Sequence, residues 1–171
     1  KGVFWGASAG WEITKENFWE TSNLSNIFSS FKLRGSYGKV GNLGGIGDYA
    51  AFSTFGSGLY GGVASSLYAV SGNKNLKWET SKKTDIGLNF GILDNRITFE
   101  GAYYKNNIDG LILNVPQAPS AGVPSTIATN VGSMYNQGVE LGINATPVQS
   151  SAFSWNTSFN ITFNKNEVTS L

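Results

Sequence analysis

Strict alternation between apolar and polar side chains marks residues 153–164, which read FSWNTSFNITFN. Apart from Thr157, the odd positions are large and apolar, whereas every even position is Ser, Asn or Thr. Successive side chains of a β-strand point to opposite faces, so this stretch predicts a strand with one apolar face and one uncharged polar face. Such a strand needs apolar surroundings on one side and water on the other.

A lipid bilayer and a soluble β-sandwich both supply these surroundings. A strand of about 9–11 residues crosses the apolar core of a bilayer, and its backbone polar groups are satisfied there only when the sheet closes into a barrel. Charged residues make up 13% of the 171 residues, about half of the ~25% that is usual in soluble domains. We therefore favour the barrel over the sandwich.

The same alternation recurs along the chain and predicts an all-β fold, an antiparallel meander of about six long strands. A membrane barrel of this kind has at least ~8 strands, so we expect the six to form an arc of a large transmembrane β-barrel. The predicted strands are 2–12, 31–41, 82–93, 96–114, 136–146 and 152–164.

The lengths of the connections predict which end of the strands faces the outside. Links 93–96 and 147–151 are short, whereas 42–81 and 115–135 are long, rich in Gly, Ser, Pro and Ala, and expected to be irregular loops. Outer-membrane barrels have short turns on the periplasmic side and longer loops outside. The first link, 13–30, is expected to be an elaborated periplasmic turn.

Two turns set the expected strand registers. The Asp-Asn pair at 94–95 tolerates positive φ, which predicts a two-residue hairpin loop that places Phe90 opposite Phe99. At the last turn we expect Val139 to lie opposite Phe159. In both hairpins the apolar positions then share one face, as a correct register requires.

Carboxylates on the predicted polar face raise the question of catalysis. Asp85, Glu100 and Glu140 lie there, and paired carboxylates can hydrolyse glycosidic bonds. A solvated ion network explains them without catalysis, with Arg96 four residues from Glu100 on the same face. The chain has no His and no Cys, which excludes zinc sites of the Cys/His kind. We predict no enzyme activity, no catalytic, cofactor-binding or metal-binding residue, and, with a net charge of +1, no nucleic-acid partner.

Aromatic residues are frequent in the long segment 42–81. Tyr49, Tyr60 and Tyr68 are candidates for contact with a ligand or a protein partner, because aromatic rings on an external loop can stack on sugars or dock against a protein. The same rings can instead pack the loop against itself, and the sequence favours this second role.

Several motifs follow one another at consistent spacing. Residues 75–80 and 84–88 read NLKWET and TDIGL, residues 130–133 and 136–141 read NVGS and NQGVEL, and the strand at 153–166 comes next. In this order they resemble the SusC/RagA-like TonB-dependent outer-membrane transporters of Bacteroidetes. The resemblance extends over essentially the whole chain.

The resemblance implies that residues 1–171 form part of an outer-membrane β-barrel domain, with the plug domain, the TonB box and the closing strands outside them. It implies a multi-pass barrel in the bacterial outer membrane, in contact with membrane lipid. The family imports oligosaccharides or peptides together with a SusD-like surface lipoprotein, and the TonB–ExbB–ExbD complex acts through the N-terminal part. The residues alone leave two alternatives open, a soluble or surface-displayed carbohydrate-binding β-sandwich and a passive porin.

Overall fold

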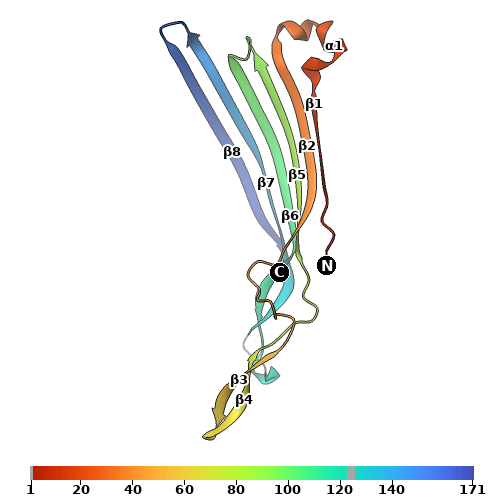
Figure 1. The fold of residues 1–171 in the computed structure, drawn as a ribbon, viewed down its shortest axis with the longest axis vertical. Helices are drawn as coiled ribbons and strands as arrows, with labels where there is room; N and C mark the ends of the chain where they lie inside the picture. Colours follow the sequence, from red (N-terminus) through yellow and green to blue (C-terminus); the bar gives the residue numbers. More distant parts are fainter. Residues whose placement is uncertain (1, 123–125) are drawn as a thin grey trace.

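A computed structural model describes residues 2–122 and 126–171. Six strands form one antiparallel sheet in the order β1-β2-β5-β6-β7-β8, and β3 and β4 pair separately with each other (Figure 1). Neighbours in the large sheet follow the chain order, which confirms the predicted antiparallel meander. The strands are β1 (Gly6–Glu12), β2 (Phe28–Asn42), β3 (Thr54–Tyr60), β4 (Val63–Val70), β5 (Glu79–Ile92), β6 (Ile97–Pro116), β7 (Thr126–Gln149) and β8 (Ser154–Ser170).

In the described residues, helical structure is limited to short turns. A four-residue helix α1 (Asn17–Glu20) lies between the 3-10 turns η1 (Ile13–Lys15) and η2 (Asn23–Asn26), and a third turn, η3 (Pro119–Ala121), follows β6. Within the described ranges, no helix has the length and apolar character needed to cross a membrane.

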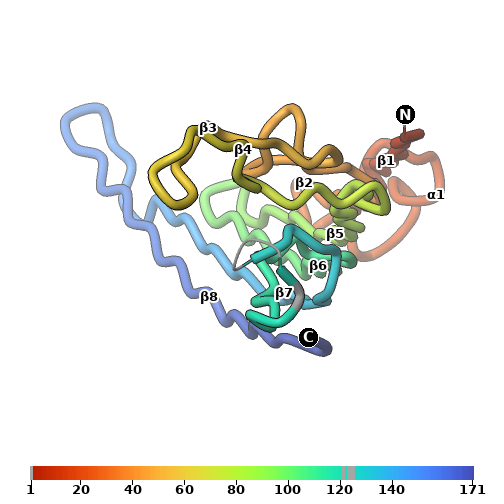
Figure 2. The backbone as a smooth tube through the Cα atoms, turned by 90° about the horizontal axis from the view of Figure 1, so that it is seen from below, coloured from red at the N-terminus to blue at the C-terminus, as the bar shows by residue number. Residues whose placement is uncertain are grey.

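The large sheet is a single open layer. Viewed from below, its strands follow one another from β1 to β8 (Figure 2). Among the described residues no large side chain is fully buried, and Phe159 and Phe163 are 61% and 60% exposed. A soluble sandwich would cover this face with a second sheet. The single layer therefore argues against the sandwich alternative.

The β5–β6 hairpin has the predicted register, with Phe90 opposite Phe99. The backbone N–H of Arg96 donates to the carbonyl of Leu93 at 3.1 Å. Between them, the Asp-Asn pair at 94–95 has φ values of 56° and 60°. Short polar side chains tolerate this left-handed conformation, which matches the twist of the two strands.

The predicted register of the last hairpin is wrong by four residues, because Val139 lies opposite Phe163 and not opposite Phe159. Strand β7 continues to Gln149 through an irregularity within 145–148, so the turn comes later than expected. A shift by an even number of residues leaves every side chain on its face. The predicted facing of β8 relative to β7 is therefore retained.

Both long connections contain more strand than expected. Within 42–81, β3 and β4 form a hairpin around Gly61 and Gly62, whose φ values are 57° and 84°. A Gly-Gly pair is a signal for such a turn, but Gly and Ser interrupt the apolar alternation of the flanking strands. Strands β6 and β7 also extend into 115–135. The expectation of irregular loops is therefore wrong in both segments.

The two ends of the large sheet differ in their connections. The turns at 93–96 and 150–153 and the helical turn at 13–27 lie at one end, whereas the β3–β4 hairpin projects beyond the other (Figure 1). This asymmetry is typical of outer-membrane barrels, which have short turns inside and long loops outside. On this basis we call the hairpin end the outer end and the helical turn the periplasmic turn.

Trp19 fixes the periplasmic turn to the sheet. Its side chain is 8% exposed, and its ring centroid lies 6.2 Å from that of Phe28 and 5.7 Å from that of Phe31. Phe31 in turn stacks on Phe90 at 6.4 Å. Such aromatic pairs contribute about 0.5–1.5 kcal/mol each beyond the burial of their area. The row of rings therefore joins the turn to β2 and β5.

We expect Trp19→Ala in the full-length protein to lower the free energy of unfolding by about 3 kcal/mol, because removing a buried large aromatic ring leaves a cavity. The matched control is Phe18→Ala in the same helix, whose ring is 55% exposed; we expect it to cost about 1 kcal/mol or less. Urea titration in detergent, followed by circular dichroism, measures both. Equal losses would contradict the role of Trp19.

Candidate functional site: two faces of a sheet and an outer-loop pocket

One face of the large sheet carries a continuous band of apolar side chains. On β5, β6, β7 and β8 it spans seven residues, which at ~3.3 Å per residue measure roughly 23 Å, similar to the ~25 Å apolar band of outer-membrane barrels. We define the apolar band by four cross-strand rows, Phe28–Ile92–Ile97–Ala145–Thr157, Phe31–Phe90–Phe99–Ile143–Phe159, Leu33–Leu88–Gly101–Leu141–Ile161 and Gly35–Ile86–Tyr103–Val139–Phe163.

The opposite, polar face carries an ion network. Arg34 on β2 donates from Nη1 to Asp85 Oδ1 at 2.8 Å and from Nη2 to Glu100 Oε1 at 3.2 Å. Gly87 lies under the guanidinium, and a Cβ at this position would collide with the Arg34 side chain. The missing side chain on β5 therefore lets one arginine span from β2 to β6.

Arg96 does not pair with Glu100, so this part of the predicted ion network is wrong. Arg96 instead donates to the backbone carbonyls of Thr146 and Pro147, at 3.3 Å and 2.9 Å from Nη2. These carbonyls lie in the irregular part of β7, where regular pairing with β8 is interrupted. Their exposed acceptors attract the guanidinium, and Glu100 pairs with Arg34. Arg34 and Glu100 are 66 positions apart in the sequence, so local spacing could not reveal their pairing.

The rest of the polar face presents hydrogen-bonding groups to water. Glu100, Glu140 and Asn160 line a shallow hollow of about 310 Å³. Tyr104 donates its hydroxyl hydrogen to Asn164 Oδ1 at 3.1 Å. In the part of the chain that the structure describes, no three His, Cys, Asp or Glu residues cluster closely enough to hold a metal ion. Chemically, this face can hydrate and hydrogen-bond a passing solute.

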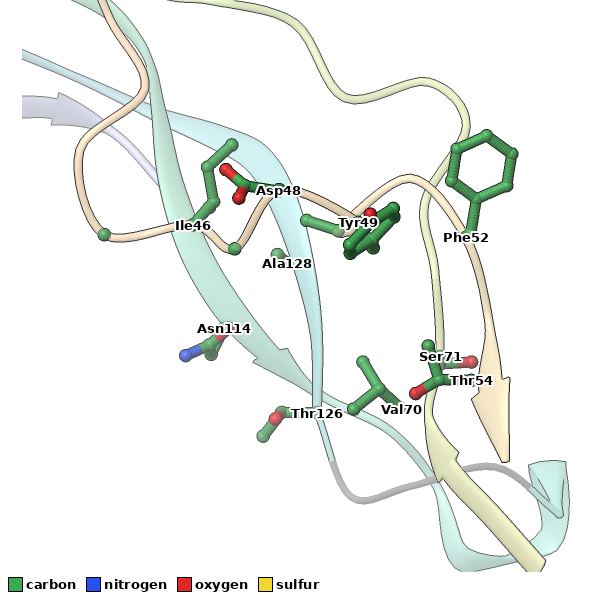
Figure 3. A pocket seen from close by; sticks show the side chains of 13 residues that line it. Ile46, Asp48, Tyr49, Phe52, Thr54, Val70, Ser71, Asn114, Thr126 and Ala128 are labelled. Atoms are coloured by element: carbon green, nitrogen blue, oxygen red, sulfur yellow. The ribbon is translucent and has the colours of Figure 1, made fainter. Parts of the chain in front are cut away.

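A pocket of about 380 Å³, here called the outer-loop pocket, lies at the outer end (Figure 3). Three segments enclose it: the loop after β2, the base of the β3–β4 hairpin, and the ends of β6 and β7. Figure 3 shows Asp48, Tyr49 and Phe52 on the loop. The lining also includes Thr54, Val70, Ser71, Asn114, Thr126 and Ala128.

Two asparagines tie the loop segments to β6 and β7. Asn73, between β4 and β5, donates from Nδ2 to the carbonyl of Ala128 at 2.9 Å. Asn130 Oδ1 accepts from the backbone N–H of Lys77 at 2.7 Å, and its Nδ2 donates to the carbonyls of Lys77 and Gly110. These bonds give the pocket a fixed wall. Sequence reasoning missed this wall because it treated 115–135 as a loop.

The three candidate tyrosines occupy different places. Tyr49, 73% exposed, lines the outer-loop pocket, whereas Tyr60, 80% exposed, lies beside the turn at the tip of the β3–β4 hairpin. Tyr68 donates its hydroxyl hydrogen to Ser53 Oγ at 2.8 Å, and its ring centroid lies 4.7 Å from that of Phe55. The structure therefore does not bring the three together, and Tyr68 contacts its own loop.

An apolar band on one face, a hydrated polar face behind it, and short turns opposite long outer segments define the wall of a transmembrane β-barrel. The comparison with known families is specific. Residues 1–170 match the model of the family described as TonB dependent receptor-like, beta-barrel, and the chain belongs to this family, whose barrels lie in the bacterial outer membrane.

Individual relatives agree with the resemblance drawn from the motifs. The chain is 34% identical over 181 residues to the TonB-dependent receptor SusC of Bacteroides thetaiotaomicron, covering 99% of this chain and 17% of SusC. It is 35% identical over 174 residues to the TonB-dependent receptor P3 of Formosa agariphila, covering 94% of this chain and 16% of that receptor. The chain thus spans about a sixth of the length of these relatives.

A solved structure gives the same result for the fold. The RagAB peptide importer in its open-open state superposes with a TM-score of 0.85 at 28% sequence identity, over 98% of this chain and 18% of that one. The SusC/RagA-like resemblance is therefore confirmed.

Because Phe159 faces the apolar side and Asn160 the polar side of β8, we expect a charged residue to destabilise the barrel at the first position and not at the second. Lysine at Phe159, in the middle of the apolar band, should cost about 2–4 kcal/mol, while lysine at Asn160 on the polar face should be tolerated. Heat-modifiable electrophoretic mobility of the full-length barrel measures the folded fraction of Phe159→Lys and Asn160→Lys. Similar damage from both substitutions would contradict the facing.

Proposed function

We propose that the chain is a wall segment of a TonB-dependent outer-membrane transporter that imports oligosaccharides or peptides. In this proposal residues 1–171 are one part of the barrel domain, and the plug domain, the TonB box and the closing strands belong to other parts of the protein. The observation that carries the proposal is the sheet itself, with lipid-type side chains on one face and a hydrated lumen-type surface on the other.

The relatives support the energy source and the partner. SusC and P3 are TonB-dependent receptors, and RagAB is a peptide importer. We extend these properties to the full-length protein, with TonB–ExbB–ExbD acting through its N-terminal part and a SusD-like lipoprotein at the outer end. Membrane lipid contacts the apolar band. No covalent chemistry is assigned to the wall, because Arg34, Asp85 and Glu100 on its polar face form a solvated ion network.

Dependence on TonB separates this proposal from a passive porin. We expect a strain lacking the full-length gene to regain uptake of a labelled oligosaccharide or peptide mixture when the gene is restored. Because transport needs energy from the inner membrane, uptake should fall to the level of the deletion strain when TonB is absent. Uptake that persists without TonB would support the porin and contradict the proposal.

Different ligands are proposed for the two most exposed tyrosines. Tyr49 lines the outer-loop pocket, where its ring can stack on a sugar or a peptide side chain. Tyr60 lies at the tip of a hairpin that projects beyond the sheet (Figure 1), the position a surface lipoprotein would reach first. Tyr68 supports the hairpin through Ser53 and Phe55.

We expect Tyr49→Ala to weaken substrate binding by up to about tenfold, the equivalent of one aromatic contact, and to leave lipoprotein association unchanged. Tyr60→Ala should weaken lipoprotein association and spare substrate binding. Titration calorimetry with substrate and co-purification with the lipoprotein measure the two effects, and each variant is the control for the other. Loss of both properties in one variant would indicate a collapsed loop and contradict the assignment.

A further inference from the structure

A row of lysines follows the outer edge of the apolar band. Along β2, β5, β6 and β8, the first charged side chain beyond the band on the same face is in each case a lysine. We call these four residues the lysine belt: Lys39, Lys82, Lys105 and Lys165. The band-bearing face of the described strands carries no other lysine, at its periplasmic edge or within the band.

The belt steps by one row between β5 and β6. On β6, Lys105 comes directly after Tyr103, whereas on β2 the band-bearing face continues through Tyr37 before Lys39. The edge therefore lies one row further along β2 than along β6. Strands of outer-membrane barrels are tilted by about 35–45°, so a level boundary must cross them obliquely.

Aromatic side chains lie at the same boundary. The rings of Trp5 and Tyr37 are 5.3 Å apart, and Lys105 and Lys165 place their ammonium groups 5.3 Å and 5.7 Å from the ring centroid of Tyr135. Tyr and Trp concentrate at the headgroup level of membranes, where one end of the side chain is apolar and the other is hydrated. The belt therefore lies at the depth of lipid headgroups.

The acids of this region leave the belt with a positive excess. Lys82 pairs with Asp109 and Lys165 with Glu167, at 2.8 Å and 2.7 Å. In each pair the lysine is nearer to the apolar band and the acid lies one row further out. Among the described residues, Lys39 and Lys105 form no ion pair.

We propose that the lysine belt binds the phosphate groups of phosphorylated lipids in the outer leaflet. This inference rests on the proposed function only for the orientation of the barrel in the membrane. Ammonium groups above an apolar surface complement a lipid whose acyl chains contact the band and whose phosphate lies at its edge. The belt is thus a lipid-headgroup site continuous with the lipid-facing wall.

The test uses the full-length transporter in detergent, with phosphatidic acid as the probe and phosphatidylcholine and diacylglycerol as comparison lipids. Native mass spectrometry counts the bound lipids. We expect the unsubstituted protein to prefer phosphatidic acid and to lose the preference at high salt, because exposed charges are screened. Lys39→Gln combined with Lys105→Gln should weaken binding by about 25-fold, at roughly fivefold for each lysine.

Matched controls separate the site from general charge. Lys32→Gln combined with Lys83→Gln makes the same change in charge on the polar face, and it should stay within about twofold of the unsubstituted protein. Lys39→Arg combined with Lys105→Arg should retain binding. Inorganic phosphate should not displace the lipid, because it lacks the acyl chains that contact the band; displacement would show an anion site without lipid specificity and overturn the proposal.

The two proposals fail in different ways. If TonB-dependent uptake is normal but the Lys39→Gln, Lys105→Gln protein binds phosphatidic acid as well as the unsubstituted protein, the lipid-headgroup site is wrong and the transporter stands. If the lysines control lipid binding but uptake does not depend on TonB, the site stands and the transporter proposal is wrong. Equal loss in the polar-face control overturns the site, because general charge would then explain the binding.

Discussion

Every backbone amide and carbonyl that enters a bilayer must find its partner on a neighbouring strand, and this requirement explains where the sheet is regular. The pairing of β5 with β6 is unbroken over its whole length. In the other ladders that cross the apolar band, the register shifts lie at or beyond the band's edges: at 28–30, at 109–112, at 133–134 and at 145–148. Irregular backbone is thus confined to levels where water or polar side chains can satisfy it, as Arg96 does for the carbonyls of Thr146 and Pro147.

The same ladders determine what each face can do. Since side chains alternate, an unbroken register sends every second residue towards lipid and the others towards water over the whole width of the sheet. Glycine contributes where a long side chain must cross a strand, as at Gly87 beneath Arg34. The exposed ion network of Arg34, Asp85 and Glu100 adds little to stability, and its main consequence is a charge-balanced, hydrated surface.

Sequence reasoning recovered the parts of the fold that depend on period and on short turns. Alternation revealed all six strands of the large sheet, and the Asp-Asn turn fixed the β5–β6 register. It failed where long-range pairing decides the outcome. The β3–β4 hairpin was hidden by Gly and Ser, and the last two residues of β6 and the outer part of β7 by Pro, Ala and Gly. The pairing of Arg34 with Glu100 was hidden by a separation of 66 positions. The sequence identified the three candidate tyrosines. Their different positions depend on the β3–β4 hairpin, which the sequence did not predict.

Strand β7 has 24 residues, which at ~3.3 Å per residue measures about 80 Å, whereas a tilted crossing of the bilayer needs only about 9–11 residues. Its outer part, paired with β6 as far as Pro116, forms a ribbon that joins the membrane wall through the bulge at 109–112. A force on the ribbon's far end therefore reaches the wall through paired strands, and the bulge, where a strand bends and twists more strongly, is a place where the ribbon can change its angle to the membrane.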